Sequence, residues 1–521
     1  MPGPVLERSR TESTELGTAT DKQQSFAVRF RVPGWIVPLG LAGLALGIYA
    51  PVLRGGYFID DWELLLANPR QNILGAFLKL HPYSFYRPLQ LSLVAIAQNL
   101  VGPSTLPIHL VQVAILVALA LLVAKACREL GASRWGELAG ALWVVCAQIA
   151  AAGIGGIDTI SQTLGTLSGV AACWCLYAAA RRGQRPVPWV PLVLFGVALL
   201  SKETSVAYLP LLTVLAYRAE TAHERGSRRL GVAMAMSFVI LGAVYWIWRL
   251  RLGGSIPTLG AGTYDMRLGA NLLVHPIMLW FSALLPVSTV RVFTNIATHG
   301  WFWPLAGVLG VSLMLAILIL GLKRAGKLQW GLWWGAAATS TLATVVPLTH
   351  VSELYAFLLV PFIGVAIGLA TDSLLKASMN RVSLRWLAVF VPLILAANAV
   401  ETRIKAASME ENGRVAGSLT AQLVSRFQEV PPNGEVVLVD APKSIPDYSV
   451  FRVGGFKLVD DGTILRLSRR PDISIRRAAS VGDSVASGYA ARGSVVVTLD
   501  PGRTRVINFV PGSSSKTPTA P

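Results

Sequence analysis

Charged residues are scarce in this chain of 521 residues, where they make up 14% against 53% for hydrophobic residues. Soluble domains carry roughly 25% charged residues, so this composition excludes an ordinary soluble protein and indicates lipid as the main solvent. Acidic residues are fewer than basic residues: the chain has 28 Asp and Glu and 46 Lys and Arg, which gives a net charge of +18. Because the mean hydropathy is +0.55, we attribute the basic excess to loops that contact an anionic membrane face, and we expect no nucleic-acid partner.

Cysteine and histidine are also rare. Four cysteines exclude a scaffold built from disulfides, and all four lie in apolar runs that are typical of small hydrophobic fillers: Cys127, Cys146, Cys173 and Cys175. The six histidines form no HxxxH or HxxEH pair, which argues against a zinc hydrolase. The absence of a repeat of about 20–50 residues excludes a solenoid.

Long apolar segments recur along the chain and predict an all-α polytopic membrane domain at 35–401, with about eleven spans. The first, Trp35 to Leu53, exceeds the core of a signal peptide and is expected to remain as an anchor. The later segments follow at about 106–126, 135–151, 157–180, 189–200, 204–217, 231–250, 302–322, 330–348, 354–371 and 385–401. The two segments around Ser201-Lys202-Glu203 are short, so each crosses only part of a bilayer unless this break lies near a membrane surface.

Lys and Arg in the short loops predict the orientation. Basic residues before the first span place residues 1–34 in the cytoplasm, where their polar composition predicts a disordered tail. The later basic loops, including Lys323 to Lys327, then fall on the same side if the apolar stretch 271–287 does not cross. That stretch contains Pro276 and Pro286, and we favour an amphipathic or re-entrant element on the outer face over a full crossing.

The character of the chain changes after the last apolar segment. A helical stretch at 404–427 leads to strand-like runs at 435–439 and 494–498. We therefore expect a small extracytoplasmic α+β or β-rich domain at 402–511. A Ser/Thr/Pro-rich disordered tail is expected to follow it at 512–521.

Polar residues in the loop after the first span are the first candidates for a functional site. Asp60 and Asp61 lie among aromatic residues just outside the membrane. They are either part of a helix N-cap in a solvated acidic turn or carboxylates whose pKa is tuned for general-base chemistry. Arg87, between Tyr86 and a proline, is either an interfacial anchor or a guanidinium placed on a lipid phosphate.

Two further polar residues lie at the outer ends of neighbouring spans. His109 opens the second span, where a hydrogen-bonded structural role is the simpler interpretation and a site role is the alternative. Asp158 occupies the outer turn before another span, where it is either an N-cap for the next helix or a member of the same site.

Charged residues that interrupt apolar stretches are costly and often functional. Lys202 and Glu203 are either a structural ion pair or a phosphate-binding lysine oriented by local acids. Glu353 and Tyr355, in a later outer linker, are weak signals on their own. All these candidates map to the outer ends of different helices, whereas unrelated loop charges would divide between the two faces.

Together these motifs resemble the GT-C superfamily of integral-membrane glycosyltransferases, and in particular the protein O-mannosyltransferases, including the transmembrane and TPR-containing mannosyltransferases. The resemblance covers roughly residues 35–400. Its most specific elements are Ser-Lys-Glu-Thr at 201–204 and Tyr-Arg-Pro-Leu at 86–89. The TPR array is absent, Gln112 stands where the family often has Asn, and Leu354 stands where an Arg commonly follows the Glu. The donor sugar and the acceptor therefore stay open.

The resemblance implies a GT-C-like transmembrane catalytic domain. It would move a sugar, for example a hexose such as mannose, from a polyprenyl-phosphate donor to an acceptor hydroxyl on the extracytoplasmic face, with inversion. Asp60 or Asp61 would be the catalytic base. Arg87 and Lys202 would bind the donor phosphate. The supporting residues would be Tyr86, His109, Asp158, Glu203, Glu353 and Tyr355.

The implied setting is a multi-pass protein of the cell (inner) membrane, surrounded by membrane lipids. The acceptor would be a protein or an envelope glycan or lipid. The motifs name no cofactor and leave a divalent metal requirement open. One alternative is a lipid or solute transporter, although transporters break their helices near the midplane and often in two repeated halves. Another is a non-catalytic membrane subunit that displays the C-terminal domain, which predicts no need for Asp60, Arg87 or Lys202.

Overall fold

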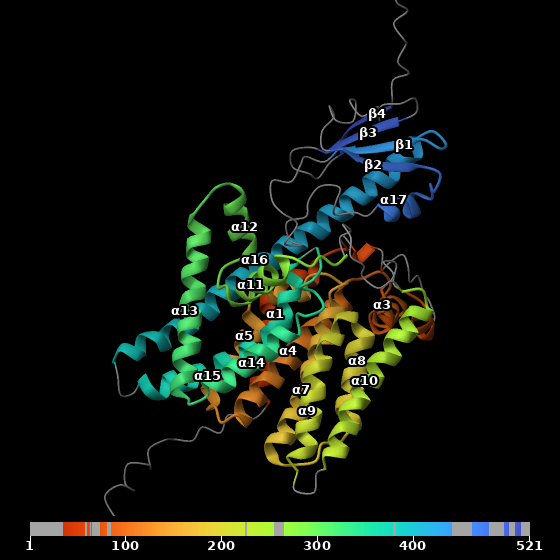
Figure 1. Ribbon diagram of the computed structural model, residues 1–521. Helices are drawn as coiled ribbons and strands as arrows, with labels where there is room; N and C mark the ends of the chain where they lie inside the picture. Colours follow the sequence, from red (N-terminus) through yellow and green to blue (C-terminus); the bar gives the residue numbers. More distant parts are fainter. Residues whose placement is uncertain are drawn as a thin grey trace, which may run out of the picture.

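The computed structural model describes residues 35–57, 60–62, 64, 73–80, 85–223, 227–254, 265–349, 351–378, 382–439, 461–478, 494–499 and 506–511. They form a helical body with a small β-sheet beyond one end (Figure 1). The tails predicted at 1–34 and 512–521, and parts of the domain predicted at 402–511, lie outside the described residues.

Each predicted apolar segment contains a helix. The helices of the body are α1 (Ile36–Tyr49), α3 (Pro88–Val101), α4 (Leu106–Glu129), α5 (Arg134–Cys146), α6 (Ala150–Ile154), α7 (Ile160–Arg182), α8 (Trp189–Ser201), α9 (Leu209–Thr221), α10 (Arg228–Arg251), α11 (Asn271–Leu284), α12 (Thr289–Ala297), α13 (Phe302–Arg324), α14 (Leu328–Ser340), α15 (Val360–Ser378) and α16 (Val382–Arg426). Short 3-10 helices are η2 (Val52–Arg54), η3 (Ile73–Leu78), η4 (Glu203–Tyr208), η5 (Glu353–Leu359) and η6 (Phe427–Glu429).

Among the described residues, five helical segments are long and apolar enough to cross a membrane: α4, α7, α10, α13 and the continuous stretch Glu353–Ala377 formed by η5 and α15. Several other apolar helices are shorter, including α1, α3, α8 and α11. The total of eleven crossings therefore stays a prediction.

Small residues allow α5 and α15 to pack backbone against backbone. Gly136 and Gly140 lie one turn apart on α5, and Gly364 and Gly368 have the same spacing on α15. A Cβ added at Gly136 would lie 2.6 Å from the carbonyl oxygen of Gly368, and one at Gly140 would lie 2.8 Å from that of Gly364. Such close contacts stabilise helix pairs in lipid, where the hydrophobic effect drives little association between helices.

Helix α11 begins and ends beside one linker, which joins α14 to η5. Near its start, His275 Nδ1 lies 3.0 Å from the carbonyl oxygen of Val346. Shortly after its end, Thr289 donates a hydrogen bond to Glu353. The segment from Val346 to Glu353 therefore contacts residues near both ends of this element. Whether 271–287 crosses the membrane, and on which side it lies, stays a prediction.

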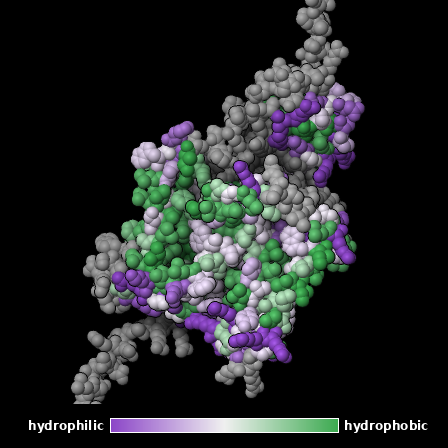
Figure 2. All heavy atoms as spheres, viewed as in Figure 1, coloured by the Kyte–Doolittle hydropathy of each residue, from purple (hydrophilic) through white to green (hydrophobic). Residues whose placement is uncertain are grey.

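The opposite end of the bundle gathers basic loops. Arg324, Lys327 and Lys376 line one pocket of about 470 Å³ there. Arg181 donates a hydrogen bond to the carbonyl oxygen of Glu129, which tethers another basic loop to this end. Figure 2 shows hydrophilic side chains at this end and hydrophobic side chains over the helices above it. The loops that the charge rule assigns to the cytoplasm thus lie close together.

Helix α16 differs from the sequence expectation because it is continuous. The predicted span at 385–401 and the helical stretch predicted at 404–427 form one helix of 45 residues. Neither proline nor glycine stands between Leu393 and Asn412, so no residue there disfavours helical backbone. The helix extends from the body to the sheet (Figure 1).

A mixed four-stranded sheet of order β2-β1-β3-β4 lies beyond α16. Its strands are β1 (Glu435–Val439), β2 (Ser474–Ala478), β3 (Ser494–Leu499) and β4 (Val506–Pro511), and α17 (Asp461–Ser468) precedes β2. Strand β1 pairs in parallel with β2 and β3, and β3 pairs antiparallel with β4. The strands predicted at 435–439 and 494–498 are confirmed.

Candidate functional site

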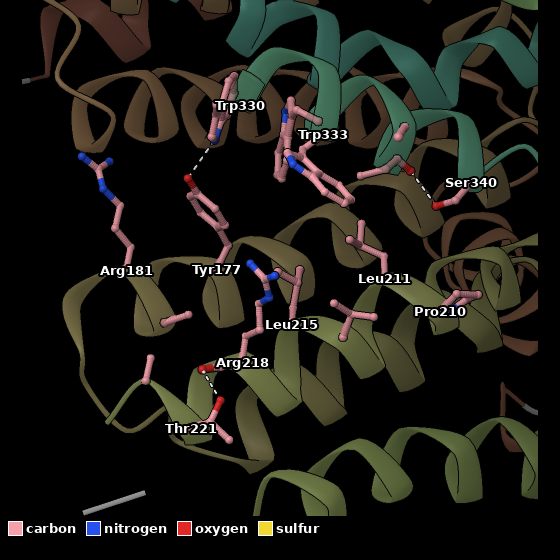
Figure 3. A pocket seen from close by; sticks show the side chains of 16 residues that line it. Tyr177, Arg181, Pro210, Leu211, Leu215, Arg218, Thr221, Trp330, Trp333 and Ser340 are labelled. Atoms are coloured by element: carbon pink, nitrogen blue, oxygen red, sulfur yellow. Dashed lines mark hydrogen bonds between the residues drawn. The ribbon is translucent and has the colours of Figure 1, made fainter. Parts of the chain in front are cut away.

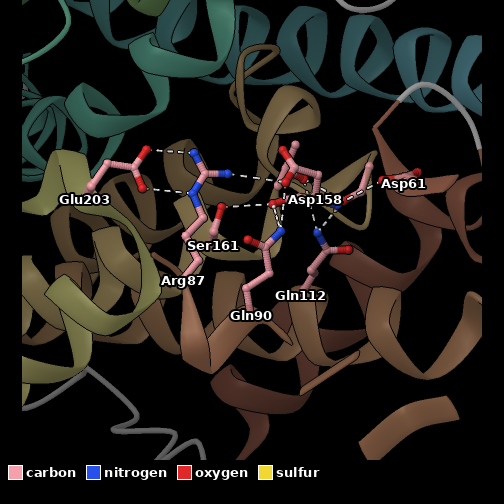
Figure 4. A network of polar contacts seen from close by, with 9 residues as sticks. Asp61, Arg87, Gln90, Gln112, Asp158, Ser161 and Glu203 are labelled. Atoms are coloured by element: carbon pink, nitrogen blue, oxygen red, sulfur yellow. Dashed lines mark hydrogen bonds and ion pairs between the residues drawn. The ribbon is translucent and has the colours of Figure 1, made fainter. Parts of the chain in front are cut away.

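Arg87 lies at the centre of a buried network of charges (Figure 4). Its Nε is 2.9 Å from Glu203 Oε2 and its Nη2 is 2.7 Å from Glu203 Oε1, so the two side chains form a bidentate ion pair. Its Nη1 lies 3.4 Å from Asp158 Oδ1. A planar guanidinium that holds a carboxylate at two points fixes its orientation as well as its charge. Arg87 therefore joins acids from two distant segments.

The local sequence around Arg87 explains its position. Pro88 at the first turn of α3 suits a helix start, because proline lacks only an N–H that would be unpaired there. The Phe85 ring lies 4.2 Å from the guanidinium carbon of Arg87. Tyr86 holds the backbone, since its hydroxyl donates to Phe77 O and its carbonyl accepts from Tyr245, each at 3.1 Å. Tyr86 thus supports the site structurally.

Asp158 connects this network to the first outer loop. Gln90 Nε2 donates to both the carbonyl oxygen and the carboxylate of Asp158 at 2.8 Å. The backbone N–H of Asp158 donates to Asp61 Oδ1 at 2.9 Å. Helix α7 begins after Thr159 at its N-cap, with no side-chain cap. Asp158 therefore shares one network with Arg87, Gln90 and Asp61, and Thr159 occupies the N-cap of α7.

The two aspartates of the first loop differ in exposure. Asp61 is 2% exposed, and its contact with the Asp158 backbone lies inside the network. Asp60 is partly exposed. Its charge also acts on Lys202, since Asp60 raises the pKa of that lysine. Asp60 is therefore the more accessible carboxylate beside the network.

Lys202 occupies the break between α8 and η4, outside the long apolar helices. It caps α8 in an extended conformation and is 4% exposed. Its ammonium lies 5.9 Å from the centre of the Tyr355 ring. No hydrogen bond or ion pair joins that ammonium to another described residue, and Glu203 pairs with Arg87 instead. The structure therefore does not show the Lys202–Glu203 ion pair that the sequence left open.

Burial and neighbouring charges act in opposite directions at this break. Burial and Arg87 lower the pKa of Lys202 to about 8, although Asp158, Glu203 and Asp60 raise it. Burial raises the pKa of Glu203, but Arg87 and Lys202 outweigh it and bring that pKa down to about 2. Glu203 is thus an anion at neutral pH, and the pKa of Lys202 lies below that of an exposed lysine.

A glycine on α7 makes room for the break. A Cβ added at Gly165 would lie 2.9 Å from Ser205 Oγ and 3.6 Å from Lys202 Cβ. Those distances leave space for the backbone of the break but little for a larger side chain. Gly165 therefore allows the segment that carries Lys202 and Glu203 to pack against α7.

His109 adopts the structural role. Its Nδ1 lies 2.9 Å from Gln112 Oε1 and 3.2 Å from the carbonyl oxygen of Ile154. Gln112 Nε2 in turn donates to the carbonyl oxygen of Gly156 at 2.7 Å. Both side chains are buried and hold the turn that precedes Asp158. His109 therefore positions the loop of the site.

Glu353 belongs to a second buried cluster. Its carboxylate accepts a hydrogen bond from Thr289 and lies 3.0 Å from Lys405 Nζ, on α16. Tyr355, two residues later, faces Lys202 instead. Glu353 therefore belongs to the second cluster, whereas Tyr355 lies beside Lys202 and the network around Arg87.

Gln90, Thr289 and Lys405 were not predicted from the sequence. Gln90 directly follows the Tyr-Arg-Pro-Leu motif, and Lys405 lies just past a predicted span, so their positions offered a signal. Thr289 lies in an element with no motif of its own. Among the described residues, no group of three His, Cys, Asp or Glu side chains is arranged to hold a metal ion.

Residues 81–248 match the family model described as Dolichyl-phosphate-mannose-protein mannosyltransferase. The matched segment contains Arg87, Asp158, Lys202 and Glu203, and it ends before Glu353. The match confirms the resemblance to the GT-C membrane glycosyltransferases that the motifs predicted. None of the curated proteins compared with the chain matches it.

Two solved structures are similar to the chain over most of its length. One is the crystal structure of ArnT from Cupriavidus metallidurans bound to undecaprenyl phosphate, with 16% identity, a TM-score of 0.44 and coverage of 90% of this chain and 93% of that chain. The other is ArnT from the same organism in the apo state, with 14% identity, a TM-score of 0.47 and coverage of 89% and 93%.

Proposed function

We propose that this chain is a multi-pass membrane glycosyltransferase that moves a sugar from a polyprenyl-phosphate donor to an acceptor hydroxyl on the extracytoplasmic face. The observation that carries this proposal is the network of Asp61, Asp158, Arg87 and Glu203, with the cation of Lys202 beside it. These residues come from separate parts of the chain and meet at one end of the bundle. The match to a mannosyltransferase family supports the reaction class.

Lys202 is the residue best placed to receive the donor phosphate. Its buried ammonium has no ion pair among the described residues, while at least three N–H groups of Arg87 already point at carboxylates. A preorganised cation stabilises the charge that develops on a departing phosphate, and it acts strongly where water is excluded. We therefore assign the phosphate contact first to Lys202. Arg87 contributes the electrostatic field of its positive charge, and its guanidinium orients Glu203 and Asp158.

Asp60 is the proposed general base. Its carboxylate is partly exposed, so an acceptor hydroxyl can approach it, whereas Asp61 is buried against the Asp158 backbone. The acceptor oxygen forms a bond to the anomeric carbon as its proton passes to Asp60. The bond from that carbon to the phosphate oxygen breaks on the opposite face, and the phosphate keeps the electron pair. This displacement inverts the anomeric carbon and needs no second acid, because phosphate leaves without protonation.

We further propose a hexose such as mannose as the transferred sugar, in keeping with the family of the matched segment. The acceptor is a protein or an envelope glycan or lipid. The proposed division of the chain is a catalytic domain at 35–401 and an extracytoplasmic domain at 402–511, which α16 carries away from the body.

The test is transfer by purified protein in a membrane of defined lipid, with a synthetic polyprenyl-phosphate sugar as donor. Asp60→Asn and Lys202→Ala should each abolish transfer. Both variants should still insert into the membrane and keep the wild-type unfolding temperature. Lys323→Ala, which removes an exposed lysine from the opposite end of the bundle, is the matched control and should keep full activity. Full activity in both site variants would refute the mechanism.

The acceptor and the sugar require a separate measurement. Mass spectrometry of envelope glycans and proteins from cells that lack this chain should show the loss of one sugar from one class of acceptor. Re-expression of the wild type should restore that sugar, and re-expression of Lys202→Ala should not. Unchanged glycans and glycoproteins in those cells would contradict the proposed activity.

A further inference from the structure

A groove of about 790 Å³ opens at the basic end of the bundle, between α7, α9 and α14. Its basic end, lined by Arg181 at the end of α7, lies about 30 Å along that helix from Ser161, whose hydroxyl donates to the carbonyl oxygen of Asp158 in the network around Arg87. The other end of the groove reaches Pro210, eight residues after Lys202, so it is the basic end that is remote from that network. Its volume lies within the roughly 300–1,000 Å³ that is typical of small-molecule sites.

The walls of the groove are aromatic and aliphatic. Trp330 stacks on Trp334 with ring centres 5.4 Å apart, and its Nε1 donates to the hydroxyl of Tyr177 at 2.8 Å. These contacts make one rigid wall. Val214 on α9 lines the opposite side and is 55% exposed. Trp333, at the mouth, is 76% exposed. An apolar surface of this kind suits an acyl chain.

Two cations stand at one end of this apolar surface. Arg181 at the end of α7 and Arg218 on α9 both line the groove, and they lie toward the end that holds Trp330, away from Pro210 and Ser340 (Figure 3). None of the described residues that line the groove is acidic. The exposed Arg218 side chain forms no ion pair or hydrogen bond with another described residue. Positive charge at one end and apolar walls along the rest match a molecule with an anionic head and a long tail.

We propose that the groove binds one anionic phospholipid from the leaflet on this side, which the charge rule predicts to be the cytoplasmic leaflet. The phosphate lies between Arg181, whose Nη1 also donates to the carbonyl oxygen of Glu129, and Arg218, because guanidinium groups bind phosphate oxygens. One acyl chain follows the wall of Trp330 and Trp334 toward Pro210. Tryptophan at a membrane surface commonly lies at the level of the lipid headgroups. The proposal places Trp330 at that level.

Native mass spectrometry of the purified full-length protein tests the proposal. The protein is mixed with equal amounts of phosphatidylglycerol and phosphatidylcholine that carry the same acyl chains. We expect the wild type to retain one phosphatidylglycerol in preference. The double variant Arg181→Gln/Arg218→Gln should reduce that retention about tenfold or more, since each basic residue near a membrane surface attracts anionic lipid. Arg228 is an exposed arginine at the same end but outside the groove, so the control variant Arg228→Gln should still retain phosphatidylglycerol in preference.

A second variant separates the shape of the groove from its charge. Val214→Trp fills the apolar side while leaving both arginines in place, and it should displace the retained lipid of either headgroup. Equal retention of both lipids by the wild type, or wild-type preference in the double arginine variant, would overturn the proposal. Displacement of phosphatidylglycerol by an equimolar polyprenyl phosphate would also overturn it, because the groove would then hold the carrier lipid.

Discussion

Arg87 and Glu203 are separated by 116 residues in the sequence, yet they form a buried bidentate ion pair that joins the start of α3 to the break after α8. The same guanidinium approaches Asp158, so one cation holds two anions from two other segments. Removing either partner would leave a buried charge without its counter-ion, which is strongly destabilising. The pair thus fixes the relative positions of the elements that carry the site.

Arg87→Lys should lower kcat/KM on the order of 10²-fold, because a lysine keeps the charge but cannot hold Glu203 at two points, and small misplacements are costly in catalysis. The measurement is steady-state transfer together with the unfolding temperature in detergent. Arg128→Lys is the matched control, since Arg128 holds Glu137 at two points at an exposed position. Equal activity in Arg87→Lys and wild type would show that the bidentate geometry is dispensable.

The pH dependence of the transfer rate should report the protonation state of Lys202. Its ammonium is present below its pKa and is lost as the pH rises through about 8. If it binds the donor phosphate, kcat/KM in the free enzyme should decline above that pH. Lys202→Arg keeps a positive charge to much higher pH, so its residual activity should lack this decline. A wild-type profile that stays flat to pH 10 would assign the phosphate contact to another residue.

Substitutions of the two aspartates of the first loop should have different effects, one on transfer activity and the other on thermal stability. Asp60→Asn should abolish transfer with little change in the unfolding temperature, because Asp60 is partly exposed. Asp61→Asn should mainly lower the unfolding temperature, since Asp61 is buried and accepts the Asp158 N–H. Parallel measurements of transfer and thermal unfolding on both variants check this assignment. The reverse pattern would make Asp61 the base.

Most residues of the network around Arg87 could be singled out from the sequence because their signals are local. A lysine and a glutamate inside an apolar run, or two aspartates among aromatics, stand out wherever the helices pack. The partners could not be predicted, because the role of Gln90 depends on its approach to Asp158 in another segment. The continuity of α16 was also missed, since the change from apolar to polar residues near 401 resembles a boundary although the backbone continues.

Glu353 and Lys405 form the second buried ion pair, and both side chains are almost fully enclosed. Breaking such a pair on one side leaves an uncompensated charge and costs about 3–5 kcal/mol, whereas replacing both residues with apolar groups of similar size is often neutral. Glu353→Gln and Lys405→Met should therefore each lower the unfolding temperature markedly. The double variant Glu353→Met/Lys405→Met should recover most of that loss.

Thermal unfolding of the four proteins in one detergent measures the coupling between Glu353 and Lys405. Arg414→Met is the control on the same helix, because its ion pair with Glu411 is exposed and should contribute little. Because Lys405 lies on α16 and Glu353 lies two residues before Tyr355, the single variants should also reduce transfer by loosening the segment that faces Lys202. Additive effects of the two single variants on the unfolding temperature would show that the pair does not act as a unit.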